Sequence, residues 1–439
     1  MSGEADTLSD NCWPIPSSWQ WARMAEVSRV IAGGTPSTLD STNFDGGTIP
    51  WITPADLSGF SEKTISRGAR SITQRGLDTS GAQLIPRGSV LLSSRAPIGY
   101  VAVAGSQLTT NQGFKSFALG PAVTSDYVYY YLHRAKEIAL KMASGTTFLE
   151  LSKKRAESLP IPVPPLPEQH RIVEAIETNF ARLEAAAEGL SRAREDLKRY
   201  RAAVWRSALV GALVDLPPDT PRVCLFDAVD DLDGHRVPVN ASTREGRVGD
   251  VPYYGATGQV GWIDDHLFDE ELVLLGEDGV DFLDPLKPKS YVIHGKSWVN
   301  NHAHVLRAKT GVMISGFLET QLNATSYAGL VNGTTRLKLT KSAMRQIHVL
   351  APPIAVQSRV LSEVDRLLSM GRDNEHRVSQ AQSRMGSLRE ALLRTAFSGR
   401  LVPQDPSDEP ASTLLERIRH ERLSSSQPMT RRRKAVRAS

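Results

Sequence analysis

The sequence predicts an α+β protein in which two mixed α/β domains with short strands are separated by two long antiparallel coiled-coil helices with pseudo-two-fold symmetry. Three observations predict this fold class. Residues 145–214 recur at residues 333–402, always 188 positions later. Each copy contains a long run of apolar residues with heptad spacing. The segment before each copy is rich in glycine, hydroxyl and β-branched residues, which favour short strands and turns.

Length and composition limit the classes of protein to consider. The chain has 439 residues, 40% of them hydrophobic, which is enough for about three folded units. Its two cysteines, Cys12 and Cys224, are too few for a disulfide framework or a structural zinc site. No apolar stretch approaches the roughly 20 residues that span a bilayer, and residues 1–10 lack a secretion signal. We therefore expect a cytoplasmic protein with no membrane partner.

The first segment, from about residue 20 to residue 160, is expected to form short strands joined by turns. Residues 33–37, Gly-Gly-Thr-Pro-Ser, are typical of a turn, whereas residues 89–94 have the composition of a strand. A helical pattern follows over residues 127–143 and ends before the Gly-Thr-Thr loop at residues 145–147.

The first long helix is predicted to begin after a proline-rich entry. Prolines at positions 160, 162, 164 and 165 rule out regular helix there. Pro167 suits the first helical turn, because the N–H that proline lacks has no helical partner in that turn. Apolar residues then recur at alternating spacings of four and three up to residue 208. A helix from about residue 167 to residue 210 is roughly 65 Å long.

The second half of the chain repeats this order. Residues 217–350 again favour strands, with a helical pattern over residues 312–327, and the second long helix is expected to follow Pro353. Because one long helix cannot bury its apolar seam alone, we expect the two helices to pair within one molecule. A trimeric or intermolecular bundle is the alternative. The predicted seam residues are Ile176, Phe180, Leu183, Leu190, Leu197, Val204, Val364, Leu368, Val378, Met385 and Leu392.

The last residues are expected to form a short amphipathic helix, over about 411–422, and then a basic tail. The tail contains five basic residues between positions 431 and 437, which exceed the net charge of +4 of the whole chain. The remaining chain is therefore slightly acidic, and bulk charge does not identify a partner. The preferred interpretation of the tail is a solubilising terminus, and a phosphate-binding arm is the alternative.

Sequence motifs of catalysis are missing. Gly295-Lys296-Ser297 has Ser290 where a phosphate-binding loop requires glycine. The sequence contains no His-Glu-x-x-His or Gly-x-Ser-x-Gly motif. Acidic residues cluster on expected turns of the second segment, which favours solvated loops over a metal site. We expect neither enzymatic activity nor a metal site in this chain, and a self-contained enzyme is disfavoured.

Duplicated domains joined by paired helices indicate a reader of two half-sites. Antiparallel helices give an approximate two-fold symmetry that matches the two-fold relation between the strands of a DNA duplex. Since the two segments differ in sequence, we expect the two half-sites to differ as well. A coiled-coil scaffold whose domains bind protein is the rival hypothesis.

A set of motifs extends over nearly the whole chain. It comprises Trp19, residues 33–37, Ile49-Pro50-Trp51, residues 159–162 with Gln169 and Ile172, residues 253–258 (Tyr-Tyr-Gly-Ala-Thr-Gly) and residues 397–403 (Phe-Ser-Gly-Arg-Leu-Val-Pro). In these motifs the chain resembles the DNA-recognition (specificity) subunits of type I restriction–modification systems.

The resemblance implies target-recognition domains at residues 1–160 and 216–350, spacer helices at 161–215 and 351–402, and a short helix with a basic tail at 403–439. It implies that the chain reads a bipartite, asymmetric DNA site and is not itself an enzyme. The implied partners are double-stranded DNA, two methyltransferase (modification) subunits and restriction (translocase) subunits. No cofactor is implied in this chain, because S-adenosylmethionine, ATP and Mg²⁺ are used by the partner subunits.

The candidate DNA contacts are amide, hydroxyl, imidazole and basic side chains, most of them on expected turns. Asn and Gln pair with adenine, and Arg pairs with guanine. The alternative is that Asn111-Gln112 and Asn300-Asn301 cap strands or turns and that Thr35 and Ser37 brace a Gly-Pro loop. The candidates are Thr35, Ser37, Ser94, Arg95, Asn111, Gln112 and Lys115 in the first domain, and Thr257, Gln259, Lys296, Asn300, Asn301, His302 and His304 in the second.

Charge is distributed unevenly between the two segments. Residues 22–160 contain fifteen basic and ten acidic residues, whereas residues 217–350 contain thirteen basic and seventeen acidic residues. Because DNA binding needs basic groups at the contact face, these groups have to be concentrated in the second segment. Residues 284–309 contain five basic residues and one acidic residue, and we expect the DNA face there.

Overall fold

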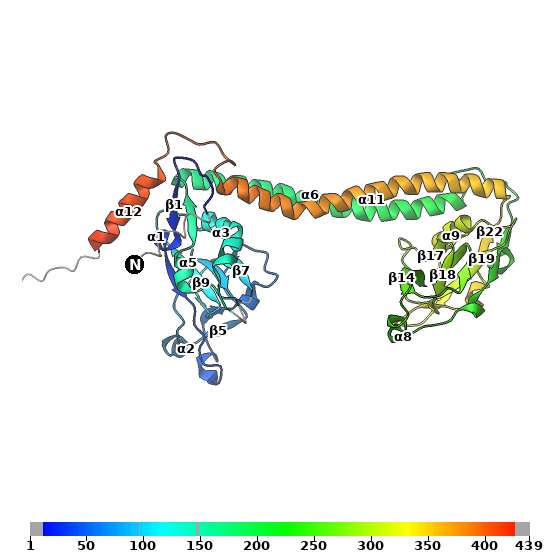
Figure 1. The fold of residues 1–439 in the computed structure, drawn as a ribbon, viewed down its shortest axis with the longest axis horizontal. Helices are drawn as coiled ribbons and strands as arrows, with labels where there is room; N and C mark the ends of the chain where they lie inside the picture. Colours follow the sequence, from blue (N-terminus) through cyan, green and yellow to red (C-terminus); the bar gives the residue numbers. More distant parts are fainter. Residues whose placement is uncertain (1–11, 96, 146–148, 426–439) are drawn as a thin grey trace, which may run out of the picture. The chain divides into compact units, whose positions relative to one another are not determined.

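The computed structural model describes residues 12–95, 97–145 and 149–425, which form two compact units (Figure 1). Unit 1 comprises residues 1–185 and 384–439, and unit 2 comprises residues 186–383. The Gly-Thr-Thr loop at residues 145–147 and the basic tail lie largely or wholly outside the described residues. Among the described helices, none combines the length and the apolar character needed to cross a membrane.

Unit 1 is built on a five-stranded sheet and a smaller three-stranded sheet. The strand orders are β2-β9-β6-β7-β4 and β5-β3-β8, and β1 pairs with β10 in antiparallel orientation. The elements of its N-terminal part are β1 (Gln20–Arg23), α1 (Met24–Val27), β2 (Ser28–Ala32), η2 (Ser41–Asn43), β3 (Ile49–Ile52), η3 (Pro54–Leu57), β4 (Thr64–Ile65), β5 (Arg70–Ile72), α2 (Gln74–Asp78), β6 (Val90–Ser94), β7 (Ile98–Ala104), β8 (Thr109–Thr110), β9 (Phe114–Leu119), α3 (Ser125–Arg134), α4 (Lys136–Met142), α5 (Lys153–Glu157) and β10 (Pro160–Val163).

Helix α3 joins the larger sheet of unit 1 to the long helices. Its tyrosines Tyr127 and Tyr131 are fully buried, and their hydroxyls donate to the carbonyls of Pro162 and Pro160 on β10. The ring of Phe397, at the end of α11 (Ile354–Phe397), packs edge-on against both tyrosine rings, with centroids 5.2 and 5.3 Å away. The core of unit 1 is therefore continuous from the sheet to the helix pair.

Unit 2 has two four-stranded sheets. Their strand orders are β12-β19-β16-β17 and β14-β13-β18-β15, and β11 pairs with β22. The elements are β11 (Arg222–Cys224), α7 (Leu225–Ala228), β12 (Val229–Asp231), η4 (Asp233–His235), α8 (Ala241–Glu245), β13 (Val251–Gly255), β14 (Gly258–Ile263), β15 (Phe268–Asp269), β16 (Leu272–Gly276), β17 (Ser290–Ile293), β18 (Lys296–Val299), β19 (Ala303–Ala308), α9 (Ser315–Ala324), β20 (Val331–Asn332), β21 (Lys338–Leu339), α10 (Lys341–Met344) and β22 (His348–Leu350).

The two units share one strand order. The series β2-β9-β6-β7 of unit 1 corresponds to β12-β19-β16-β17 of unit 2, and β5-β3-β8 corresponds to β14-β13-β18. We call β5-β3-β8 and β14-β13-β18-β15 the small sheets, with β3 and β13 as their middle strands, and the other sheet of each unit the larger sheet. Strands β3 and β13 each have one antiparallel and one parallel neighbour. The sequence repeat is evident only from residue 145 onward, whereas the structural repeat extends over the globular parts as well. A buried strand needs only apolar residues of suitable size, so topology persists where sequence identity has faded.

The long helices are α6 (Leu166–Leu209) and α11, and the predicted antiparallel pairing within one chain is confirmed. In unit 1, Arg389 of α11 is 3.2 Å from the carboxylate of Glu184 on α6. In unit 2, the hydroxyl of Tyr200 on α6 donates to the carbonyl of Leu367 on α11, at 3.3 Å. Residue numbers rise along one helix as they fall along the other.

The predicted seam residues line this pairing in each unit. Ile176, Val204 and Val364 are buried. The remaining predicted seam residues are half-buried, because two helices alone cover a seam only partly. These half-buried residues are Phe180, Leu183, Leu190, Leu197, Leu368, Val378, Met385 and Leu392.

A repeated glutamine fastens each long helix to its own unit. Gln169 is fully buried, and its amide oxygen accepts from the Thr124 N–H at the start of α3, while its NH₂ group donates to two carbonyls. Gln357 makes the same three bonds in unit 2, and its acceptor bond comes from the Ile314 N–H at the start of α9. The sequence repeat therefore preserves a buried polar clamp.

The C-terminal segment returns to unit 1 and ends in α12 (Ala411–Ser425), predicted at residues 411–422. Leu414, Leu415 and Ile418 enter the core of unit 1. The Ala411 N–H donates to the Ser18 carbonyl, 3.0 Å away, so the start of the helix lies against the segment that precedes β1.

Candidate nucleic-acid interface

The small sheet of unit 1 supports the glycine-rich loop at residues 33–37. Trp51 on β3 is buried, and its indole N–H donates to the Gly34 carbonyl at 3.0 Å. The loop also lies against the turn that follows β8, because the Gly34 N–H donates to the Thr110 carbonyl at 2.9 Å. A Cβ atom at Gly33 would lie 1.8 Å from the Asn111 carbonyl oxygen, so only glycine permits this approach.

Three predicted residues meet where this loop touches the turn. The Asn111 N–H donates to the Ile52 carbonyl of β3, and the Asn111 side-chain oxygen accepts from the Gly113 N–H, both at 2.9 Å. Asn111 thus caps the turn, as the alternative interpretation expected. The exposed hydroxyl of Thr35 donates to the side-chain oxygen of exposed Gln112. Thr35 and Gln112 therefore form one polar tip on the small sheet.

Unit 2 has the same turn in the same place. The Asn300 N–H donates to the Tyr254 carbonyl of β13 at 3.0 Å, and its side-chain oxygen accepts from the His302 N–H at 2.8 Å. The residue after the capping asparagine, Asn301, is exposed in the position that Gln112 occupies in unit 1. The two small sheets therefore present matched turns with different exposed side chains.

The other predicted residues of unit 1 fall into an exposed and a buried group. Ser37 is exposed on the glycine-rich loop. Ser94 and Lys115 are buried together, with the ammonium nitrogen 3.1 Å from the Ser94 hydroxyl and 3.4 Å from the Glu150 carboxylate. Burial lowers the pKa of Lys115, although Glu150 opposes this effect. Arg95 is half-buried beside them, where its backbone bridges to Glu150.

The other predicted residues of unit 2 also fall into an exposed group and a more buried group. Thr257 and Gln259 are exposed at and beside the turn that joins β13 to the edge strand β14, and Lys296 is exposed at the start of β18. His302 is half-buried, with Nδ1 2.9 Å from the Asp278 carboxylate. His304 is 2% exposed, between the Asp233 carboxylate and the Leu339 carbonyl.

Most of the basic side chains at residues 284–309 are engaged within the chain. Lys287 pairs with Asp281 at 2.6 Å. Lys289 is buried and donates to two backbone carbonyls, and Lys309 donates to a third. Arg307 forms a bidentate pair with Glu270, whose pKa this pairing lowers. Within the described chain, only Lys296 of the five has no hydrogen-bond or ion-pair partner, so the stretch offers little free positive charge.

One acidic cluster in unit 2 has the composition of a metal site. Asp233, Glu277 and His304 place ligand atoms within 4.8 Å of one another. The Arg236 guanidinium lies 2.7 Å from Glu277 and 3.3 Å from Asp233, and Lys338 is 2.8 Å from the other Glu277 oxygen. Burial raises the pKa of Glu277, but hydrogen bonds from these two cations outweigh it and lower the pKa. Protein cations already balance the cluster, which ties η4 to β16 and β19.

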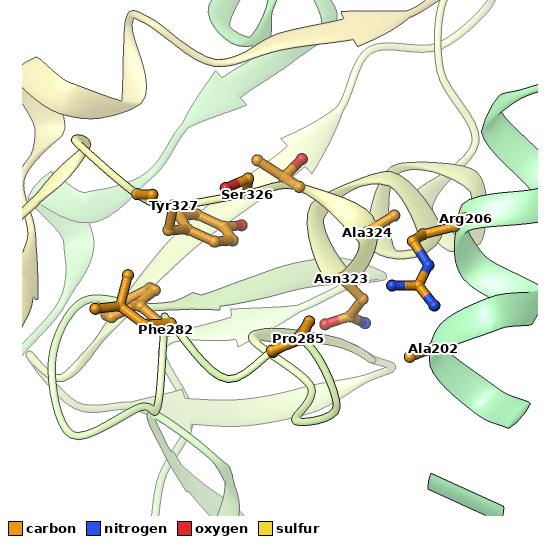
Figure 2. A pocket seen from close by; sticks show the side chains of 11 residues that line it. Ala202, Arg206, Phe282, Pro285, Asn323, Ala324, Ser326 and Tyr327 are labelled. Carbon is orange, nitrogen blue, oxygen red and sulfur yellow. The ribbon is translucent and has the colours of Figure 1, made fainter. Parts of the chain in front are cut away.

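A cavity of about 220 Å³ lies elsewhere in unit 2. Figure 2 shows Arg206 of α6 beside Asn323 and Ala324, where α9 ends, with Phe282 and Tyr327 on the far side. None of the candidate DNA contacts lines this cavity.

Three arginines that the sequence did not single out lie over aromatic residues in or beside the small sheets. They are Arg70, above Trp51 and Phe44, Arg244, above Tyr253, and Arg247, above Trp298. Their positions gave no signal in the sequence, because the stacking depends on residues far away along the chain.

Comparison with known proteins shows what the chain is similar to. Residues 16–188 match a family model described as the type I restriction modification DNA specificity domain. The MjaIX type I specificity subunit of Methanocaldococcus jannaschii is 40% identical over 165 residues, which are 37% of this chain and 38% of that relative. In that comparison the chain spans well under half of the relative's length.

Other relatives match over nearly their full length. The StySPI type I specificity subunit of Salmonella potsdam is 21% identical, with 96% of this chain and 99% of the relative aligned. The solved HsdS subunit from Thermoanaerobacter tengcongensis shares the fold, with a TM-score of 0.58, 17% identity, and coverage of 89% of this chain and 99% of that chain.

The names of these relatives agree on one role. The MjaIX and StySPI relatives are both called type I restriction enzyme specificity subunits. Residues 16–188 thus match a specificity-domain model, and the chain as a whole is similar to type I restriction enzyme specificity subunits.

Proposed function

We propose that this chain is the DNA sequence-recognition subunit of a type I restriction–modification complex. It reads a bipartite, asymmetric site, with one half-site for each small sheet and its turns. The single observation that carries this proposal is the pair of matched turns: Asn111 and Asn300 are held identically, while the exposed neighbours Gln112 and Asn301 differ. A common support with unlike exposed amides suits two unlike half-sites.

The exposed members of the candidate set are the proposed base contacts. They are Thr35, Ser37, Gln112, Thr257, Gln259, Lys296 and Asn301. Buried Ser94, Lys115 and His304 support the surface from beneath, because their polar atoms are engaged within the chain. Asn111, Asn300 and His302 shape the turns.

The chain is proposed to bind two methyltransferase subunits and, for cleavage, restriction subunits. S-adenosylmethionine, ATP and Mg²⁺ are assigned to those partners. Few unpaired basic side chains lie near the turns of unit 2, so the isolated chain is expected to bind DNA weakly. Partner subunits are proposed to supply further contacts with the duplex.

Selection from a pool of random duplexes tests this function. The chain, assembled with its methyltransferase subunits, should enrich two short motifs separated by a fixed number of unread base pairs, and the binding should weaken steeply with salt. A protein-binding scaffold would enrich no motif. Plasmid incubated with the chain alone, Mg²⁺, ATP and S-adenosylmethionine should stay uncut and unmethylated.

A further inference from the structure

In each small sheet an arginine lies over an aromatic side chain. In unit 1, the guanidinium carbon of Arg70 lies 4.0 Å from the ring centre of Phe44 and 5.7 Å from that of Trp51. In unit 2, the guanidinium carbon of Arg244 lies 4.8 Å from the ring centre of Tyr253. Stacking of this kind fixes the plane of a guanidinium without using its N–H groups.

The two aromatic residues occupy equivalent places. Trp51 and Tyr253 are each the third residue of the middle strand of a small sheet, and each is buried. Each also donates a side-chain hydrogen bond to the loop after the first strand of the larger sheet, to Gly34 in unit 1 and to Val239 in unit 2. Trp51 and Tyr253 are therefore equivalent parts of the two platforms, and Phe44 adds a second, nearer ring under Arg70.

The arginines reach this platform from different elements. Arg70 is on β5, directly opposite Trp51. The residue opposite Tyr253 on β14 is Gly261, and Arg244 comes instead from α8. The nearest atom to a Cβ built at Gly261 is the Arg244 Nε, at 3.6 Å. The guanidinium of Arg244 thus lies beside Gly261, in the place where Arg70 is found in unit 1.

Both guanidiniums keep their donors free. Across the described residues, neither has a hydrogen-bond or ion-pair partner, although Arg70 is exposed and Arg244 is half-buried. Neighbouring Arg247 also lies over an aromatic ring, that of Trp298 on β18, at 4.5 Å, but it is paired with Asp264 at 2.6 Å. A fixed, unpaired guanidinium beside the polar turns is suited to an anionic partner.

We propose that Arg70 and Arg244 are matched phosphate contacts, one for each half-site. This inference rests on the proposed function. The exposed amides of the two turns differ, as expected for reading different bases, whereas the stacked guanidinium is common to both units. The feature that both half-sites share is the sugar–phosphate backbone, and a contact with it is independent of sequence.

The test uses the chain assembled with its methyltransferase subunits and the duplex that this assembly enriches. Arg70→Ala and Arg244→Ala are each expected to weaken binding about tenfold, the loss of one charge-assisted hydrogen bond. Each should lower the slope of log affinity against log salt by about 0.9, because one phosphate contact is lost. The enriched motif should not change. The matched control is Arg417→Ala. It removes an arginine of α12 that is paired with Glu409, and it should leave the salt slope unaltered.

A conservative variant separates the loss of charge from the loss of stacking. Arg70→Lys keeps the charge without the stacked plane and should retain most of the salt slope with weaker binding. If the wild-type assembly enriches no motif, the proposed function fails and this inference fails with it. If a motif is enriched but the alanine variants keep the wild-type slope, the phosphate assignment alone is overturned. A changed motif in either variant would make that arginine a base contact and would also overturn it.

Discussion

At the scale of the residue, a repeated buried glutamine joins each long helix to its own unit. Gln169 and Gln357 satisfy two carbonyls and one N–H each, at the junction between a long helix and the helix that covers the larger sheet. The sequence shows that these glutamines repeat, but their role depends on partners brought together by folding.

Gln169→Ala is expected to destabilise unit 1 by about 1–3 kcal/mol, because a buried N–H and two carbonyls lose their partners. Urea unfolding followed by circular dichroism gives this difference in free energy. Gln83→Ala, at an exposed position, is the control and should change the midpoint little. Equal midpoints for the two variants would contradict the clamp.

Glu319 of α9 makes the stability of unit 2 depend on pH. Burial, with a smaller effect of Asp365, raises the pKa of Glu319 to about 7. The raised pKa means that ionisation favours the unfolded chain, so stability is lost as pH rises from about 4.5 to about 7 and stays low above it.

Glu319→Gln is therefore expected to raise the free energy of unfolding of unit 2 at pH 8, by up to about 3 kcal/mol, and to have little effect at pH 4.5. Unfolding curves at several pH values measure this dependence. Glu245→Gln, at an exposed position of α8, should show no such trend. A pH-independent effect of Glu319→Gln would contradict the burial argument.

At the scale of the element, the sequence predicted the long helices better than the sheets. The first helix was expected over residues 167–210 and is found over Leu166–Leu209, because proline marks its start and a repeated glycine its end. Gly211 and Gly399 both have positive φ, near +70°, which suits the residue that ends a helix. The helix expected over residues 127–143 is divided at Ala135 into α3 and α4.

The small sheets and the site were harder to predict. Strand β8 has only two residues, and its parallel pairing with β3 joins segments nearly sixty positions apart, so no local pattern marks it. The turns at Asn111 and Asn300 were predictable from residue type. The burial of Lys115 was not, because it depends on Glu150, 35 residues further along the chain.

The docking of α12 is a testable property of one element. Leu415 is 1% exposed in the core of unit 1, so Leu415→Asp places a charge in an apolar site and should release the helix. We expect trypsin to cut α12 at least about tenfold faster in this variant, since cleavage follows local opening. Thr413→Asp introduces the same charge at an exposed position of the same helix. Equal cleavage rates in the two variants would show that Leu415 does not anchor α12.

At the scale of the whole molecule, one topology occurs twice within one chain. Helices α6 and α11 each contribute residues to both units, and their paired seams make them the proposed spacer between the half-sites. In this proposal, the length of the helix pair sets the number of unread base pairs.

Seven residues added after Gly189 in α6 and after Gln382 in α11 should change the unread spacing by up to about three base pairs. The two half-site sequences should stay the same, because the turns are untouched. Selection from random duplexes measures both. Insertion into α6 alone should weaken binding, since it shifts one seam against the other, and an unaltered spacing in the double insertion would argue against a spacer role.

The central claim is that two unlike readers in one chain recognise one bipartite site. Sequencing of modified adenines in the host genome, with and without the gene for this chain, tests it most directly. The account predicts modification that depends on this gene and falls in two different short motifs at a constant separation. A single uninterrupted motif, two identical half-sites, or modification that persists without the gene would contradict it.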